Sequence, residues 1–464
     1  MVTTAEKTKL KKEGECMKKR CLSLVALLLM MMGAARGENS VYFAGCDPNS
    51  PEYRAFQELH PDVSIQTESN VYYNTQQVLN DFLTGSLPYD VFSMTSASFD
   101  IRMLMEKGYL APLTAQPDIQ EELAKMYAPV REQMMYQGEI YGVPYGCSIL
   151  YRAYSPEAWA EAGLTEADVP TSFAGLLDFL DAWILRIREQ PMDHISVINT
   201  FDEEQYGEHS YILFLTRLLI ENHMLQCSYA GEPLRFDTPL FRELLARCQS
   251  IGRQLYILEP AQKGAYALLE DQSTLNKLRY CIPQRLTEDQ PALIRASVIA
   301  SFVNVRTPEP ELAMEFLALR LQKMEPETRG YLYPDAPPVE NENQKLLMTT
   351  YQETIDELQA ALASDSLSEE ERRALTDRLA DKQAQYDQIA DPAGRYVISP
   401  EEIAVYQTYG PQLYFQPPSV LDPSTEDGQN VRQLEERFAH GSLDANALIR
   451  ELDRLAWMLE KEGE

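Results

Sequence analysis

Three hydroxyl side chains gather directly behind a short apolar stretch in the first quarter of the chain. Residues 91–94 read Val-Phe-Ser-Met, which is typical of a buried strand, and Thr95, Ser96 and Ser98 follow at once. A hydroxyl group both donates and accepts hydrogen bonds, so such a cluster can hold a polar ligand. For a single loop, the simpler interpretation is that these side chains cap the next helix.

Two further polar segments follow predicted strands in the same region. Asp47 and Asn49 come after residues 40–45, and Tyr72 and Asn74 come after residues 63–68. In an open parallel sheet, ligands bind outside the carboxyl ends of the strands. Helix N-termini at that edge add oriented N–H groups. Three polar loops on one edge favour a binding site over capping alone.

The elements that must position these loops alternate along the chain. Strands at 40–45, 63–68 and 90–94 are interrupted by a helix from Pro51 and a helix at 75–82. A hairpin and one long buried strand at 147–154 follow, and helices are expected at 173–187, 211–220 and 238–255. A strand near 297–305 and a helix at 311–322 come next. Such alternation predicts an α/β fold with a parallel sheet covered on both faces.

Residues 341–390 have a different character. Ser368 and Glu371 are spaced as a capping box after the turn "SDSLSEEE". The segment predicts an antiparallel helical hairpin whose apolar stripes pack on each other, and a partner surface is the alternative. The apolar positions of the two helices are Leu347, Tyr351, Ile355, Leu358, Leu362, Leu375, Leu379, Tyr386 and Ile389.

The N-terminal 37 residues are typical of a secretory signal peptide. A basic segment at 17–20 precedes an apolar run at 21–32 and the small residues "GAARG", and Met17 is the expected start. An uncleaved membrane anchor is the alternative. We therefore expect an extracellular or cell-surface protein. The formal net charge of −30 disfavours nucleic acid and anionic membranes as partners. The five cysteines beyond residue 37 favour buried free thiols.

Sequence motifs for catalysis are missing from the chain. It contains no His-Glu-x-x-His, no Gly-x-Ser-x-Gly, no phosphate-binding loop and no glycine-rich dinucleotide fingerprint. The five histidines are scattered, which gives no reason to expect a metal. We predict a protein that is not an enzyme and needs no cofactor.

Five motifs, in order, resemble the extracellular solute-binding proteins of family 1, which serve ABC importers. They are "LTGSLPYDVFSM" with "GYLAPL", "GEIYGVPYGCSILYRAYSPEAWAEAGL", "VPTSFAGLLDFLDAW", "TPEPELAMEFLALRL" and "HGSLDANALIRELDRL". The resemblance covers about residues 38–340 and 396–464. It implies a two-lobed fold of the periplasmic-binding-protein type II, with a cleft between lobes that close by a hinge motion.

The resemblance also implies the division of the chain. Lobe 1 would comprise 38–147 and 296–340, lobe 2 would comprise 148–295 and 396–464, and 341–395 would be an inserted helical hairpin. The two crossings would lie near Tyr145–Tyr151 and Ala296–Asn304. Beyond the three polar loops, the expected ligand contacts are Tyr145, Ser148, Asp202, Tyr206, Asp271 and Ser273, of which Asp271 and Ser273 would lie in a turn.

The implied function is capture of a small solute, most often a sugar or oligosaccharide, for delivery to ABC permease subunits by a monomeric binding protein. The alternative is a surface sensor or scaffold of the same fold. The chain departs from the family at two points. Gly33 stands where lipid-anchored members have a cysteine, and the three tryptophans, which could stack on sugar rings, lie on predicted helices away from the ligand edge.

Overall fold

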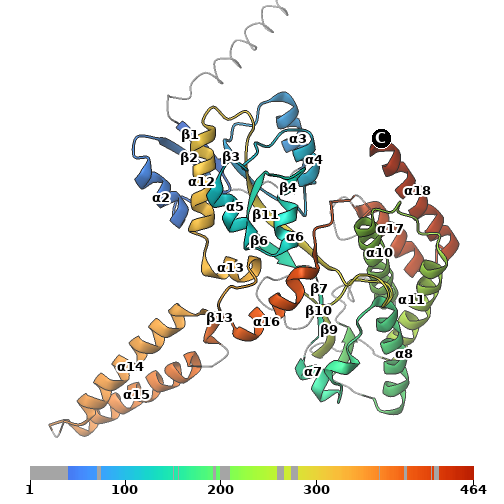
Figure 1. The fold of residues 1–464 in the computed structure, drawn as a ribbon. Helices are drawn as coiled ribbons and strands as arrows, with labels where there is room; N and C mark the ends of the chain where they lie inside the picture. The colour runs from blue at the N-terminus through green and yellow to red at the C-terminus, as the bar shows by residue number, and fades with distance from the viewer. Residues whose placement is uncertain are drawn as a thin grey trace, which may run out of the picture.

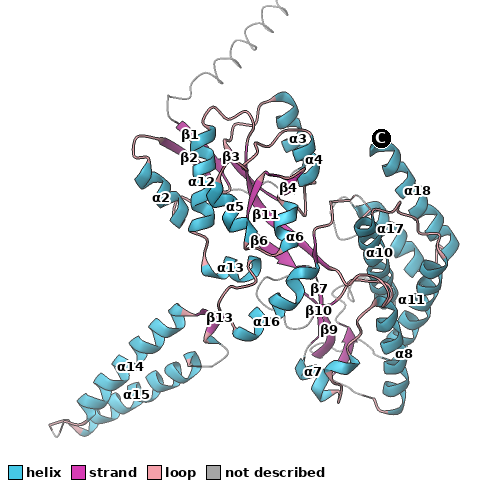
Figure 2. Cartoon of the chain, in the orientation of Figure 1, coloured by secondary structure: helices cyan, strands magenta, loops and turns pink. Residues whose placement is uncertain are grey.

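A computed structural model shows the fold (Figure 1). It describes residues 40–69, 75–149, 151–154, 156–191, 195–198, 209–258, 266–272, 281–364, 366–390, 394–419, 421–422 and 428–463. Figure 2 shows strands and helices together in two bodies, which agrees with the predicted α/β fold and with the two lobes that the resemblance implies. Within the described residues, no helix combines the length and the apolar character needed to span a membrane.

A six-stranded mixed sheet forms the centre of the first lobe. Its strand order is β14-β11-β3-β1-β2, and β6 also pairs with β11. β1, β2 and β3 run parallel, whereas β11 is antiparallel to both β3 and β6. The strands are β1 (Ser40–Ala44), β2 (Ser64–Glu68), β3 (Val91–Thr95), β6 (Gly142–Ile149), β11 (Ile294–Val303) and β14 (Leu413–Tyr414).

Helices cover this sheet, and several begin where the sequence supplies a cap. Ser50 caps the first of them through the backbone N–H of Tyr53, with Pro51 in the first turn. The helices are α2 (Pro51–Leu59), α3 (Thr75–Thr84), α4 (Ile101–Glu106), α5 (Pro117–Ala124), α6 (Ala128–Gln133), α12 (Pro310–Gln322), α13 (Pro326–Leu332) and α16 (Pro400–Tyr409), with the short turn η4 (Gly410–Gln412). A small hairpin, β4 (Met135–Tyr136) and β5 (Glu139–Ile140), also belongs to this lobe.

The second lobe has its own four-stranded sheet in the order β10-β7-β9-β8. The strands are β7 (Tyr151–Tyr154), β8 (Ile195–Ile198), β9 (Tyr266–Gln272) and β10 (Cys281–Ile282). The surrounding helices are α7 (Pro156–Glu161), η1 (Glu166–Asp168), α8 (Phe173–Glu189), α10 (Ser210–Ala230), α11 (Pro239–Leu258), α17 (Gln429–Ala439) and α18 (Ala445–Gly463). Most of α10 from Ser210 to Gln226 is buried, and the partly exposed positions Phe214, Arg217 and Glu221 lie along one stripe of the helix.

The predicted strand at 147–154 is in fact two strands in two sheets. β6 ends at Ile149 in the first lobe, and β7 begins at Tyr151 in the second. The core of the first lobe includes Ile149, and that of the second begins with Tyr154. An unbroken run of strand-forming residues does not reveal that its partner changes halfway, so the pattern alone gives one strand.

The chain crosses between the lobes a third time, which the sequence did not predict. Ile398, Leu413 and Phe415 belong to the core of the first lobe, whereas Leu421 and Val431 belong to that of the second. Residues 396–415 therefore pack with lobe 1, whereas the resemblance implies that 396–464 belongs to lobe 2. This packing favours a boundary between Phe415 and Leu421.

The segment at 341–390 forms the predicted helical hairpin, and it projects away from both lobes (Figure 1). Its helices are α14 (Glu342–Leu362) and α15 (Glu369–Ile389), and the two-stranded ladder of β12 (Val339–Glu340) with β13 (Tyr396–Ile398) forms its base. The capping box of Ser368 and Glu371 is present. Ile355 and Leu358 are buried in the hairpin but belong to neither lobe core. Leu347 was expected in the packed apolar stripe, but its side chain is 47% exposed.

Candidate functional site

The structure brings the polar loops at 46–49 and 95–98 to the same edge of the first sheet. β1 pairs with β3 in parallel, and Phe43 lies opposite Val91. The loops that follow these strands, at 46–49 and 95–98, therefore leave the sheet at its carboxyl edge, where ligands bind in open parallel sheets. β2 is also parallel to β1, so residues that follow it leave at this edge too. Tyr72 and Asn74 themselves lie outside the described residues.

The loop at 46–49 is exposed and has internal hydrogen bonds. Asp47 Oδ1 accepts hydrogen bonds from the backbone N–H of Asn49 at 2.8 Å and from its side-chain amide at 3.1 Å. Both side chains are exposed to solvent. The adjoining Gly45 has φ +73°, and a Cβ there would lie 2.5 Å from Cβ of Ser93, so only glycine fits this close approach. The loop therefore has a fixed exit from β1.

The hydroxyl cluster at 95–98 is more buried than a simple ligand loop would be. The Ser96 hydroxyl accepts a hydrogen bond from the backbone N–H of Val298, and the Ser96 N–H donates to the Val298 carbonyl, both at 2.9 Å. Ser96 is 3% exposed and Thr95 is 6% exposed, whereas Ser98 is half-buried. Asp100, not one of the hydroxyls, caps the next helix through Met103. The cluster thus ties β3 to β11, and Ser98 has the most accessible hydroxyl of the three.

A buried arginine that sequence reasoning missed lies behind this edge. Arg320 on α12 is 4% exposed and pairs through Nε with Glu52 at 3.2 Å. Its Nη2 donates to the Gly45 carbonyl at 3.0 Å, and its Nη1 donates to the hydroxyls of Ser93 and Ser301. One side chain therefore joins α12 to β1, β3 and β11. Leu319 and Leu321 flank Arg320 in a helix with buried side chains, and this is the signal that could have identified a buried charge.

Tyr145 and Ser148 lie on β6, which leads into the first crossing. The Arg320 guanidinium carbon is 4.7 Å from the centre of the Tyr145 ring, so a cation–π contact holds the half-buried ring. Ser148 is half-buried and lies opposite Ser297 of β11. Arg320 thus contacts both Gly45, which begins the first polar loop, and Tyr145. Two regions that were predicted to bind ligand, the loop after Gly45 and Tyr145, therefore both adjoin the buried Arg320 side chain.

Most of the contacts predicted for the second lobe lie outside the described residues. Asp202, Tyr206 and Ser273 lie outside the described residues. Asp271 was expected in a turn, but it lies in β9 and its backbone is opposite Arg152 of β7. Gln272, the last residue of β9, pairs with Tyr151 directly after the first crossing. The carboxyl end of β9 is therefore next to the first lobe, on the side where a shared ligand site would lie.

Two of the tryptophans pack in the core of the second lobe. Trp159 and Trp183 are 1% and 2% exposed, and Phe179 stacks against both. Trp457 on α18 is 54% exposed. The expectation that all three lie on helices is confirmed.

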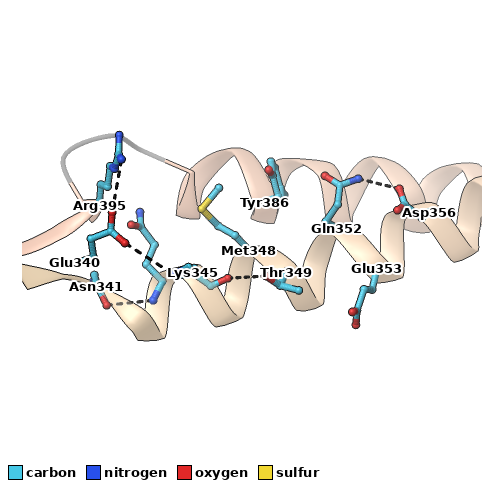
Figure 3. A pocket seen from close by; sticks show the side chains of 11 residues that line it. Glu340, Asn341, Lys345, Met348, Thr349, Gln352, Glu353, Asp356, Tyr386 and Arg395 are labelled. Atoms are coloured by element: carbon cyan, nitrogen blue, oxygen red, sulfur yellow. Dashed lines mark hydrogen bonds and ion pairs between the residues drawn. The ribbon is translucent and has the colours of Figure 1, made fainter.

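Two hollows occur away from the predicted site residues. A groove of about 550 Å³ runs along α14, with Glu340, Lys345 and Arg395 at its base and Asp356 at the other end (Figure 3). Glu340 pairs with Lys345 at 3.7 Å and with Arg395 at 3.6 Å. A cavity of about 30 Å³ lies in the second lobe between Phe173, Phe214 and Gln284. No predicted ligand contact lines either hollow.

The cysteines within the described residues behave as inert thiols. Cys46, Cys147, Cys227 and Cys248 are all free, and Cys227 alone is not fully buried. Burial raises the pKa of Cys46 to about 11 and that of Cys147 to about 12. Such thiols stay protonated near neutral pH, so their nucleophilic form is scarce. The expectation of buried free thiols is confirmed for Cys46, Cys147 and Cys248, whereas Cys227 is free but only partly buried.

An unusual carboxyl group lies in the second lobe. Glu435 on α17 is 0% exposed, and burial raises its pKa to about 8, although nearby Arg217 acts in the opposite direction. Arg217 Nε on α10 is 3.3 Å from one carboxyl oxygen. The other oxygen has no hydrogen-bond partner among the described residues. This carboxyl group joins α10 to α17 and lies among residues of the lobe core.

Comparisons with known proteins agree with this architecture. Residues 49–189 match the family described as bacterial extracellular solute-binding proteins. A sugar transporter of Rhizobium etli, solved in an open conformation, aligns with 90% of this chain and 98% of its own length, at a TM-score of 0.52 and 12% identity. At that identity, the likeness is one of fold.

Among curated relatives, the mannitol-binding protein of Pseudomonas aeruginosa is 24% identical over 161 residues. That segment is 33% of this chain and 35% of the relative, so the match spans about a third of that protein.

The fold is that of the two-lobed solute-binding proteins, with the polar loops at 46–49 and 95–98 at the carboxyl edge of one sheet. Residues 49–189 match the model of the bacterial extracellular solute-binding protein family, and the likeness over the rest of the chain is one of fold. The predicted fold class is confirmed, and the match over residues 49–189 agrees with the family that the sequence motifs resemble.

Proposed function

We propose that the protein captures a small carbohydrate or sugar alcohol outside the cytoplasm and delivers it to an ABC importer. The family match over residues 49–189 carries this proposal, because that segment includes the hydroxyl cluster, Tyr145 and the first crossing. Polar groups at the carboxyl edge suit a ligand rich in hydroxyls. The family consists of binding proteins, which supports the expectation of a non-enzymatic role.

The ligand would bind where the carboxyl edges of the two sheets face each other. Asp47, Asn49 and Ser98 offer accessible polar groups from the first lobe, and Tyr145 offers a ring held by Arg320. The relative's name, mannitol-binding protein, supports a sugar alcohol as one candidate. The ABC permease and a monomeric state stay predictions, and both follow from the family resemblance.

A thermal-shift screen of sugars, oligosaccharides and sugar alcohols tests the proposal. A true ligand present at a hundred times its dissociation constant should add about 2.7 kcal/mol to the free energy of unfolding. The Tyr145→Ala variant should then bind that ligand at least about tenfold more weakly in calorimetric titration, because it loses one aromatic contact of about 1.4 kcal/mol.

Tyr386→Ala is the matched control, since Tyr386 lies on the projecting hairpin. Its affinity should equal that of the unmodified protein. Equal affinity of the Tyr145→Ala variant would contradict the site, and a screen without any hit would contradict the proposed ligand class.

A further inference from the structure

The third crossing runs through a short connector, residues 416–420. Between Phe415 in the first core and Leu421 in the second, the chain reads Gln416-Pro417-Pro418-Ser419-Val420. Proline fixes its own φ angle and also restricts the residue before it. Residues 416–418 therefore have few backbone conformations, so the contacts beside them will influence how the lobes are arranged.

The first end of the connector makes a contact across the lobe boundary. Tyr414 lies on β14, which pairs with β11 of the first lobe through Ile294 and Arg295. Its hydroxyl is 2.8 Å from the Ser228 hydroxyl, and its ring meets Tyr229 edge-on at 5.4 Å. Ser228 and Tyr229 lie in the last turn of α10, which belongs to the second lobe.

The other end is anchored at the same junction. Asp422 is 3% exposed and forms an ion pair with Arg295 at the start of β11. The Arg295 backbone N–H donates to Gln284 Oε1 at 2.8 Å, and the Gln284 carbonyl accepts from Gln226 of α10 at 2.8 Å. The base of β11 is thus fixed to the second lobe, while Tyr414 of the neighbouring strand contacts α10 through one hydroxyl pair with Ser228 and one ring contact with Tyr229.

We propose that Tyr414 is a positioning residue that holds the two lobes in the arrangement seen here through its contact with Ser228, and so sets how often they adopt the arrangement that closes on a ligand. The link to ligand rests on the proposed function, but the effect on the lobes does not. A polar pair between hydroxyls is weak enough to break during a hinge motion and strong enough to bias it.

The test measures the lobe arrangement without any ligand. Donor and acceptor dyes at Leu83 and Ile257, which are 68% and 76% exposed on the first and second lobes, would report the interlobe distance by single-molecule energy transfer. Non-canonical amino acids should carry the dyes, because the chain has native cysteines. The Tyr414→Phe variant should shift the ratio of the interlobe populations by about fivefold, as expected from the loss of one ordinary hydrogen bond.

Ser228→Ala should give the same shift, and the double variant should add nothing further, because both remove the same contact. Tyr386→Phe, which removes a hydroxyl from the projecting hairpin, is the control and should leave the distribution unchanged. Distributions of Tyr414→Phe and Ser228→Ala that superimpose on the unmodified protein would overturn the proposal. That result would leave the proposed function intact, because the latter is tested by ligand binding.

Discussion

At the scale of single residues, Glu435 gives the protein a specific pH dependence. Burial raises the pKa of its carboxyl group from 4.5 to about 8, so the folded state binds a proton more tightly than the unfolded state. This contribution to stability is fully present below pH 4.5 and is lost as the pH rises through 8. Each unit of the shift corresponds to about 1.4 kcal/mol.

Glu435→Gln should remove this dependence, because the amide stays neutral. We expect the variant to gain stability relative to the unmodified protein as the pH rises from 5 to 9, by about 1.4 kcal/mol for each pH unit within the titration window. Urea unfolding of both proteins at pH 5 and at pH 9 measures this difference in the free energy of unfolding. Glu460→Gln on α18 is the control, since its carboxyl is exposed. If the free energies of unfolding of the variant and the unmodified protein differ by the same amount at both pH values, Glu435 does not titrate as described.

Arg320 shows what residue types and spacing could and could not predict. The helix predicted at 311–322 is present, and Leu319-Arg320-Leu321 in its last turn contained the sign of a buried charge. The partners of that charge come from Glu52, Gly45, Ser93 and Ser301, far apart in the sequence. No local pattern reveals such a meeting of distant segments. The loops at the sheet edge could be predicted because each directly follows its own strand.

At the scale of elements, the helical hairpin is the best-predicted part of the chain. The apolar spacing and the capping box locate both helices, and Ile355 and Leu358 are buried as expected. The short strands are harder to predict, and β14 has only two residues. Its pairing with β11 depends on a partner more than a hundred residues away, so no periodicity could predict it.

The hairpin should be removable without loss of either lobe. Replacement of residues 342–390 by a short glycine-serine linker should leave the melting temperature of the lobes and the affinity for a ligand unchanged, because neither lobe core includes residues of α14 or α15. The backbone bond from Asn341 N–H to the Arg395 carbonyl, 2.9 Å long, still closes the base. Calorimetric melting checks this prediction, and an unfolded or non-binding product would contradict it.

At the scale of the whole molecule, two separate cores and three crossings define what can move. Strand–helix alternation predicted an α/β fold, and the family resemblance of the motifs implied two lobes and two crossings; the structure has two separate cores. The third crossing could not be predicted, since short elements such as η4 and β14 carry no pattern that assigns them to a lobe. Three connections restrict the lobes to a hinge motion more strongly than two would.

The central claim is that the two lobes close over a small solute. Small-angle X-ray scattering of the full chain, with and without a ligand found by the thermal-shift screen and shown by calorimetry to bind, tests this claim most directly. We predict a smaller radius of gyration with the ligand, because both carboxyl edges approach each other. Identical scattering with the ligand bound would contradict the account.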